Sequence, residues 1–120
     1  MDDPRAFELS VAVEGLTYPS ETDASIVPFR WRRQPGETAV QAAIAHSPVP
    51  CPVQVISLQD LFEPLQATHE RERFATLRSL LEEWLQETIV VRAGLPQVTI
   101  HVVGRDGNDW AGVSTVSVET

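Results

Sequence analysis

The chain has 120 residues, which is enough for one domain and too few for two. Hydrophobic residues make up 42% and charged residues 22%, values typical of soluble globular domains that exclude disordered, collagen-like and coiled-coil proteins. Seventeen acidic against nine basic residues give a net charge of -8, which argues against direct binding of DNA or RNA and favours a basic partner. Solubility alone also explains such a charge.

The segments that would target or cross-link a chain are missing from the sequence. No apolar run approaches the roughly eighteen residues that a membrane helix needs. The residues from Met1 to Pro4 are acidic where a secretory signal is basic, so we expect a cytoplasmic protein without a membrane partner. Cys51 is the only cysteine, which leaves no internal disulfide and predicts a small buried side chain.

Capping residues and apolar spacing predict the helices. Asp3 as the N-cap, Pro4 at the first helical position and Gly15 at the far end mark the first helix. Ser57, with Asp60 three residues later, marks the start of a brief helix. The predicted helices lie, in chain order, between Asp3 and Gly15, from Glu37 to His46, from Ser57 through Phe62, and from near Thr68 onward. Residues 17–25 are expected to form a loop.

Alternating apolar and β-branched residues predict the strands. The predicted strands are Ile26 to Arg33, Val53 to Ile56, Gln97 to Val103 and Trp110 to Val118. Pro28 places the first of these at the edge of a sheet or gives it an irregular start, because proline cannot donate to a neighbouring strand. The Asp106-Gly107 pair predicts a hairpin between the last two strands. Residues 88–91 fit either a frayed helix end or a short strand.

This order of elements mixes crossover and hairpin connections. We therefore predict an α+β fold, with residues 1–120 forming one domain around one mixed sheet. Helices are expected on both faces of the sheet, and the chain is expected to end in an antiparallel hairpin.

The motifs of common enzymes and cofactor sites are missing. His46, His69 and His101 fall in three unrelated elements without metal-ligand spacing, and we expect each at the surface or half-buried. No G-x-S-x-G elbow and no phosphate-binding glycine loop is present, so we expect no enzyme activity, no cofactor and no metal of the protein's own. An enzyme with an unrecognised site is the least favoured alternative. Glu21 and Asp23 lie in the predicted loop, where binding residues concentrate.

Two segments resemble a known family. Val98 to Gly104 and Trp110 to Thr120, with an Ala-Gly-Val-Ser-Thr core and a final Val-Glu-Thr, resemble the closing hairpin of the nuclease A inhibitor family. Glu14 to Asp23, followed by Pro28 to Trp31, is similar to that family's helix exit, Ser-Glu loop and next strand. The resemblance covers most of the chain, closely at its two ends and loosely in the middle.

The resemblance implies a three-layer α/β/α sandwich like that of pathogenesis-related protein 1. It also implies a non-enzymatic inhibitor of a sugar-non-specific, magnesium-dependent endonuclease of the ββα-metal type, which acts by occupying the DNA-binding cleft. Carried over by position, the contacts are Glu21 and the C-terminal Thr120, the latter at the nuclease metal. Glu119 and Asp23 stand beside them in the sequence.

The family's Asp-Trp pair has no counterpart here, because Glu63 to His69 is a shorter loop that contains neither residue. Glu70 and Glu72, close to this loop, are the predicted replacement. The expected partner is a nuclease with a basic cleft, and the free protein is expected to be a monomer. The alternative is a non-inhibitory interaction module of the same fold that binds another basic protein.

Overall fold

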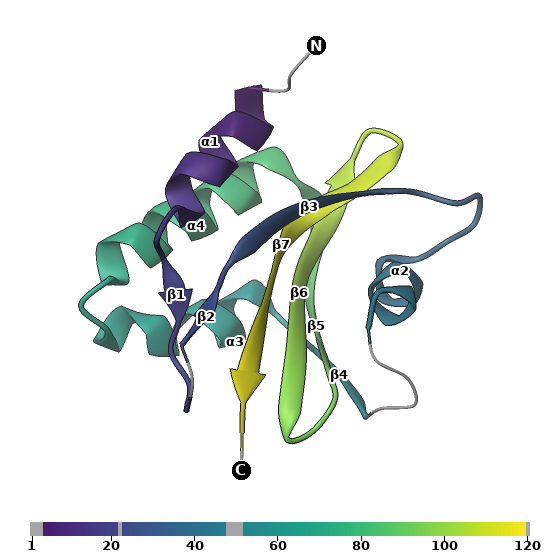
Figure 1. Ribbon diagram of the computed structural model, residues 1–120. Helices are drawn as coiled ribbons and strands as arrows, with labels where there is room; N and C mark the ends of the chain where they lie inside the picture. Colours follow the sequence, from purple (N-terminus) through teal and green to yellow (C-terminus); the bar gives the residue numbers. More distant parts are fainter. Residues whose placement is uncertain (1–3, 22, 48–51, 120) are drawn as a thin grey trace.

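The computed structural model describes residues 4–21, 23–47 and 52–119. Across these residues it has four α-helices, one 3₁₀ helix, a five-stranded sheet and a two-stranded sheet (Figure 1). The helices are α1 (Pro4–Val13), α2 (Ala39–Ala45), α3 (Leu58–Phe62), the 3₁₀ helix η1 (Pro64–Ala67) and α4 (Arg71–Trp84). The strands are β1 (Thr17–Tyr18), β2 (Ala24–Ser25), β3 (Val27–Arg32), β4 (Val53–Ile56), β5 (Gln86–Ala93), β6 (Gln97–Asp106) and β7 (Asp109–Val118).

The large sheet has the strand order β3-β7-β6-β5-β4, and every neighbouring pair is antiparallel. The predicted mixed sheet is therefore wrong, although the α+β class and the closing hairpin are confirmed. The crossover through α2 does join two strands that run in the same direction, β3 and β4. These strands lie at opposite edges of the sheet, so the crossover creates no parallel pair.

Hydrophobic clusters lie on both faces of the sheet, and helices cover each of them (Figure 1). Successive strand residues point to opposite faces, so Val90 joins one cluster and Val91 the other. The smaller cluster is centred on Trp110 and packs against α2. The larger cluster receives α1, α3 and α4 through Leu9, Val13, Leu61, Phe62, Phe74, Leu77, Leu80 and Leu81.

The helix ends follow the capping signals. Pro4 begins α1, and Ser57 caps α3 by accepting a hydrogen bond from the Asp60 amide at 3.0 Å, as predicted. Thr38 and Gln41 form a reciprocal capping box at the start of α2. The predicted N-cap Asp3 and the predicted burial of Cys51 fall outside the described residues.

Two segments differ from the sequence-based prediction, and the structure decides between the two alternatives for a third. Residues 17–25 contain the short β1–β2 hairpin, where a loop was predicted. The long helix begins at Arg71 and not near Thr68, because η1 forms first and the chain turns before α4 starts. The ambiguous residues 88–91 belong to β5.

Glycine shapes the closing hairpin at two points. Gly107 has a φ of 61° in the turn between β6 and β7, where the sequence predicted a hairpin. At Gly112, an added Cβ would lie 1.7 Å from the carbonyl oxygen of Val102 on β6. The Ala-Gly-Val-Ser-Thr motif therefore needs a glycine at this position, because a side chain would collide with the neighbouring strand.

Candidate functional site

The end of β7 is held between two loops that are far apart in the sequence. The Val118 amide donates to Ser20 Oγ at 3.2 Å, and the Glu119 amide donates to the carbonyl oxygen of Pro96 at 2.8 Å. Successive amides of an extended strand point to opposite sides, so the two bonds hold the chain from both sides. Figure 1 shows the β1–β2 loop on one side of the C-terminus and the β5–β6 turn on the other.

Arg92 anchors the last described residue of the chain. Its guanidinium donates to the Glu119 carboxylate, and this ion pair joins Glu119 to β5, the strand next to the edge strand β4. Burial by itself would raise the pKa of Glu119, but hydrogen bonds from Arg92 and Ser117 and the charge of Arg92 together lower it. Tyr18 lies close to the same pair, and its burial raises the pKa of its phenol. Glu119 is therefore a charged group held in place by the protein itself.

The two loop acids lie next to this chain end. Glu21 and Asp23 are exposed between β1 and β2. The hairpin that carries them is tied to β7 a second time, because Thr115 Oγ1 donates to the carbonyl oxygen of Ser25 at 3.0 Å. The structure thus brings the Ser-Glu loop and Glu119 to one end of the sheet. Thr120, the other predicted contact, lies outside the described residues.

Glu70 and Glu72 belong to a different part of the surface, at the start of α4. Glu70 accepts from Arg73, with a separation of 3.5 Å. Arg73 also donates to the carbonyl oxygens of Ala12 and Glu14, which lie at the C-terminal end of α1. Glu70 is therefore part of the contact between α1 and α4, while Glu72 is exposed.

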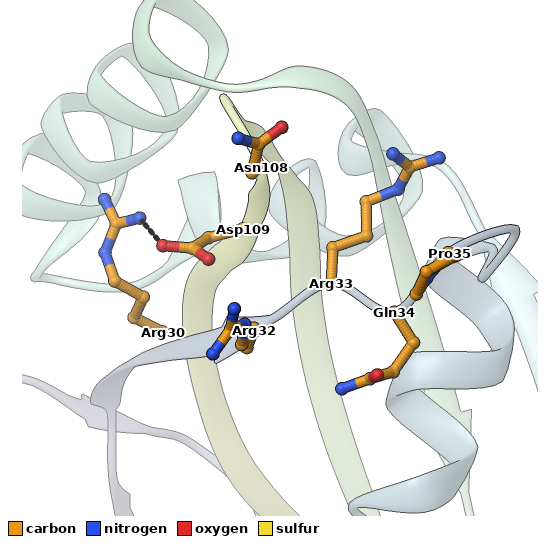
Figure 2. Close-up of a pocket in the computed structure, with 7 residues that line it drawn as sticks. All are labelled: Arg30, Arg32, Arg33, Gln34, Pro35, Asn108 and Asp109. Carbon is orange, nitrogen blue, oxygen red and sulfur yellow. Dashed lines mark hydrogen bonds and ion pairs between the residues drawn. The ribbon is translucent and has the colours of Figure 1, made fainter.

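A basic groove lies at the opposite end of β7 (Figure 2). It is open, has a volume of about 750 Å³, and is lined by Arg30, Arg32, Arg33, Gln34, Pro35, Asn108 and Asp109. Arg30 donates to Asp109 at 2.6 Å and also pairs with Asp106. No sequence motif marks this groove, because its side chains come from two distant segments: β3 with the loop after it, and the β6–β7 turn with the start of β7. Three arginines therefore gather near the start of β7, where Asp106 and Asp109 pair with Arg30, and the exposed acids Glu21 and Asp23 lie near its end.

His101 is buried, with only 4% of its surface exposed, whereas the sequence predicted a position at the surface or a half-buried one. Its Nδ1 is hydrogen-bonded to Ser114 Oγ at 2.6 Å, and its Nε2 faces the carbonyl oxygen of His46 at 3.3 Å. The His46 ring stacks on Trp31, with centroids 3.9 Å apart. Burial lowers the pKa of His101. Both ring nitrogens are used inside the protein, which gives this histidine a structural role between α2 and the sheet.

Within residues 4–21, 23–47 and 52–119, no three His, Cys, Asp or Glu side chains gather to hold a metal ion. In the same ranges, no helix is long and apolar enough to cross a membrane.

The fold and the site define an α+β domain that presents an acidic loop and a fixed chain end on one surface, an arrangement suited to binding another protein. The family model for nuclease A inhibitor-like proteins matches residues 4–120, nearly the whole chain. The chain belongs to this family. Membership suggests a nuclease inhibitor, with a nuclease as its protein partner and a non-catalytic role. A search of curated proteins gave no match.

Proposed function

We propose that this protein inhibits a sugar-non-specific, magnesium-dependent endonuclease by occupying its DNA-binding cleft. The observation that carries the proposal is the hydrogen bond from the Val118 amide to Ser20 Oγ. It joins the Ser-Glu loop to the end of β7, which supports one binding surface made of the two regions that the family resemblance assigns to the nuclease. Family membership over residues 4–120 supports the same partner class.

The chemistry of the two surfaces is complementary. A non-specific nuclease holds DNA with basic side chains at the phosphates and with a magnesium ion that prefers oxygen ligands. Glu21 and Asp23 supply exposed carboxylates beside the chain end. A C-terminal carboxylate is ionised at neutral pH, so Thr120 would bring that group and its hydroxyl to the metal. Opposite charges on the two proteins would also speed their association.

The other predicted contacts take different parts in this proposal. Glu119 is already paired with Arg92, so it would position the residue that follows it. Glu70 and Glu72 would contact the nuclease at the margin of the interface, where charges contribute less.

The proposal includes the family's three-layer α/β/α sandwich of the pathogenesis-related protein 1 type, which the helices on both faces support. It also includes a free monomer in the cytoplasm.

A plasmid-digestion assay tests the proposed function. A purified ββα-metal endonuclease is titrated with this protein, and magnesium is kept in large excess so that the acidic side chains cannot act by removing it. We expect digestion to stop near one inhibitor per nuclease. A magnesium-dependent nuclease of unrelated fold is the control and should remain active. Undiminished digestion at a large excess of the protein would disprove the proposal.

A further inference from the structure

The β5–β6 turn presents an apolar side chain at the acidic end of the molecule. Leu95 is 69% exposed, although it lies only two residues after the buried Ala93 of β5. The turn lies directly beside the chain end, because the carbonyl oxygen of its Pro96 accepts from the Glu119 amide at 2.8 Å. Figure 1 shows the end of β7 between the β1–β2 loop and the β5–β6 turn, the turn that carries the exposed Leu95.

Backbone bonds hold this turn from both sides. Besides the bond between Pro96 and Glu119, the Gly94 amide donates to the carbonyl oxygen of Pro52 at 2.9 Å. Gly94 has a φ of 103°, and an added Cβ would lie 2.5 Å from the carbonyl oxygen of Gln97. Leu95 is thus carried on a constrained backbone, so little conformational freedom would be lost when a partner covers it.

An acidic surface by itself explains fast association better than a long-lived complex. Charges at the rim of an interface mainly change the association rate, whereas apolar side chains buried at its centre slow dissociation. Single exposed leucines are common and need no explanation alone. Leu95 differs because the next residue, Pro96, is hydrogen-bonded to Glu119 at the end of β7.

We propose that Leu95 is an apolar contact of the inhibitory surface and packs into a hydrophobic depression beside the basic cleft of the nuclease. This inference rests on the proposed function. It adds a partner chemistry that the acidic residues do not imply, because the nuclease must then offer apolar as well as basic groups. Glu119, the acids Glu21 and Asp23 and Leu95 would bind as one continuous surface.

The chain offers a matched control at another position. Phe7 on α1 is also 69% exposed, but it lies on a helix whose contacts are with α4 and β3. We compare Leu95→Ala, Leu95→Met and Phe7→Ala with the unchanged protein, measuring the dissociation rate from the nuclease, the inhibition constant and the melting temperature. Because Leu95 and Phe7 are exposed, neither alanine variant is expected to unfold.

We expect Leu95→Ala to weaken inhibition about ten- to a hundredfold, mostly through faster dissociation, as the loss of a buried leucine contact implies. Leu95→Met should stay close to the unchanged protein, and Phe7→Ala should have no effect. If Leu95→Ala inhibits as well as the unchanged protein, or no worse than Phe7→Ala, the apolar contact is disproved while the proposed function stands. If the unchanged protein does not inhibit the nuclease, both proposals fall together.

Discussion

Ser20 and Val118 are 98 positions apart in the chain, yet one hydrogen bond of 3.2 Å joins the Ser20 hydroxyl to the Val118 amide. This bond sets the spacing between the Ser-Glu loop and the end of β7. Both partners lie at the end of the sheet and outside the main hydrophobic clusters. Changes here should therefore alter binding more than folding.

Replacing Glu21 with alanine should weaken inhibition by about 1–3 kcal/mol, because an exposed carboxylate that meets a basic group across an interface loses a charge-assisted contact. The melting temperature should hardly change, since Glu21 is exposed. Inhibition titrations and thermal unfolding measure the two effects. Glu83→Ala on the exposed side of α4 is the control and should change neither. Parallel losses of stability and inhibition would contradict a binding role.

Raising the ionic strength from low to physiological should reduce the association rate far more than it raises the dissociation rate, because salt screens exposed charges. The rates can be followed by stopped-flow fluorescence.

Arg32→Glu tests whether the local charge at the acidic end or the net charge of the protein sets the association rate. Arg32 lies near the start of β7, about 30 Å from the acidic end by strand length, and screening acts over about 8 Å. Arg32→Glu should therefore associate with the nuclease at nearly the original rate. If the association rate of the unchanged protein does not depend on salt, electrostatic steering is contradicted.

Arg92→Ala should weaken inhibition, because the Glu119 carboxylate loses the guanidinium that holds the chain end. The cost in stability should be only about 1 kcal/mol, since Glu119 is partly exposed and solvent screens the pair. A double-mutant cycle with Glu119→Gln should show that the two effects on inhibition are not additive. Arg78→Ala removes a comparable pair with Glu82 on α4 and should leave inhibition unchanged. Additive effects would show that Arg92 affects inhibition independently of Glu119.

The free energy of unfolding should decrease as the pH falls below about 6.5, the ordinary pKa of histidine. Burial lowers the pKa of His101, so in that range the unfolded chain binds a proton that the folded protein does not. Stability is then highest with His101 neutral, and it is lost between the unfolded pKa and the lower folded pKa. Urea unfolding across this range measures how steeply the free energy of unfolding changes with pH. His101→Gln should reduce this pH dependence, and an unchanged pH dependence would assign it to other groups.

Local signals account for the parts of the fold that the sequence predicted correctly. The Ser57 cap, the turn at Gly107 and the edge position of β3 each depend on residues close together in the chain. Pairings between distant segments were missed, because a periodic pattern identifies a strand but does not choose its neighbour. The antiparallel sheet is of this kind. The β1–β2 hairpin is local, but each of its strands has only two residues, which is too short for an alternating pattern to show.

In the candidate site, too, local features could be predicted from the sequence, whereas contacts between distant segments could not. Glu21 and Asp23 could be selected because they are acids in a predicted loop, but their place beside the chain end depends on the bond between Ser20 and Val118. The role of Arg92 requires knowledge that β5 and the chain end are close in space. The exposure of Leu95, between Gly94 and Pro96, becomes visible only in the folded turn.

The last prediction concerns Thr120, where the metal-directed mechanism differs from a purely electrostatic one. If the terminal carboxylate and hydroxyl reach the nuclease metal, a short uncharged C-terminal tag should block inhibition, whereas the same tag on Met1 should be tolerated. Deleting Thr120 should place the new carboxylate about 3.4 Å short of the metal, one residue of extended strand, and should weaken inhibition without lowering the melting temperature. Inhibition titrations of the three variants measure this. Equal inhibition with Thr120 deleted or extended would disprove the metal contact, even if Glu21 and the salt dependence behave as expected.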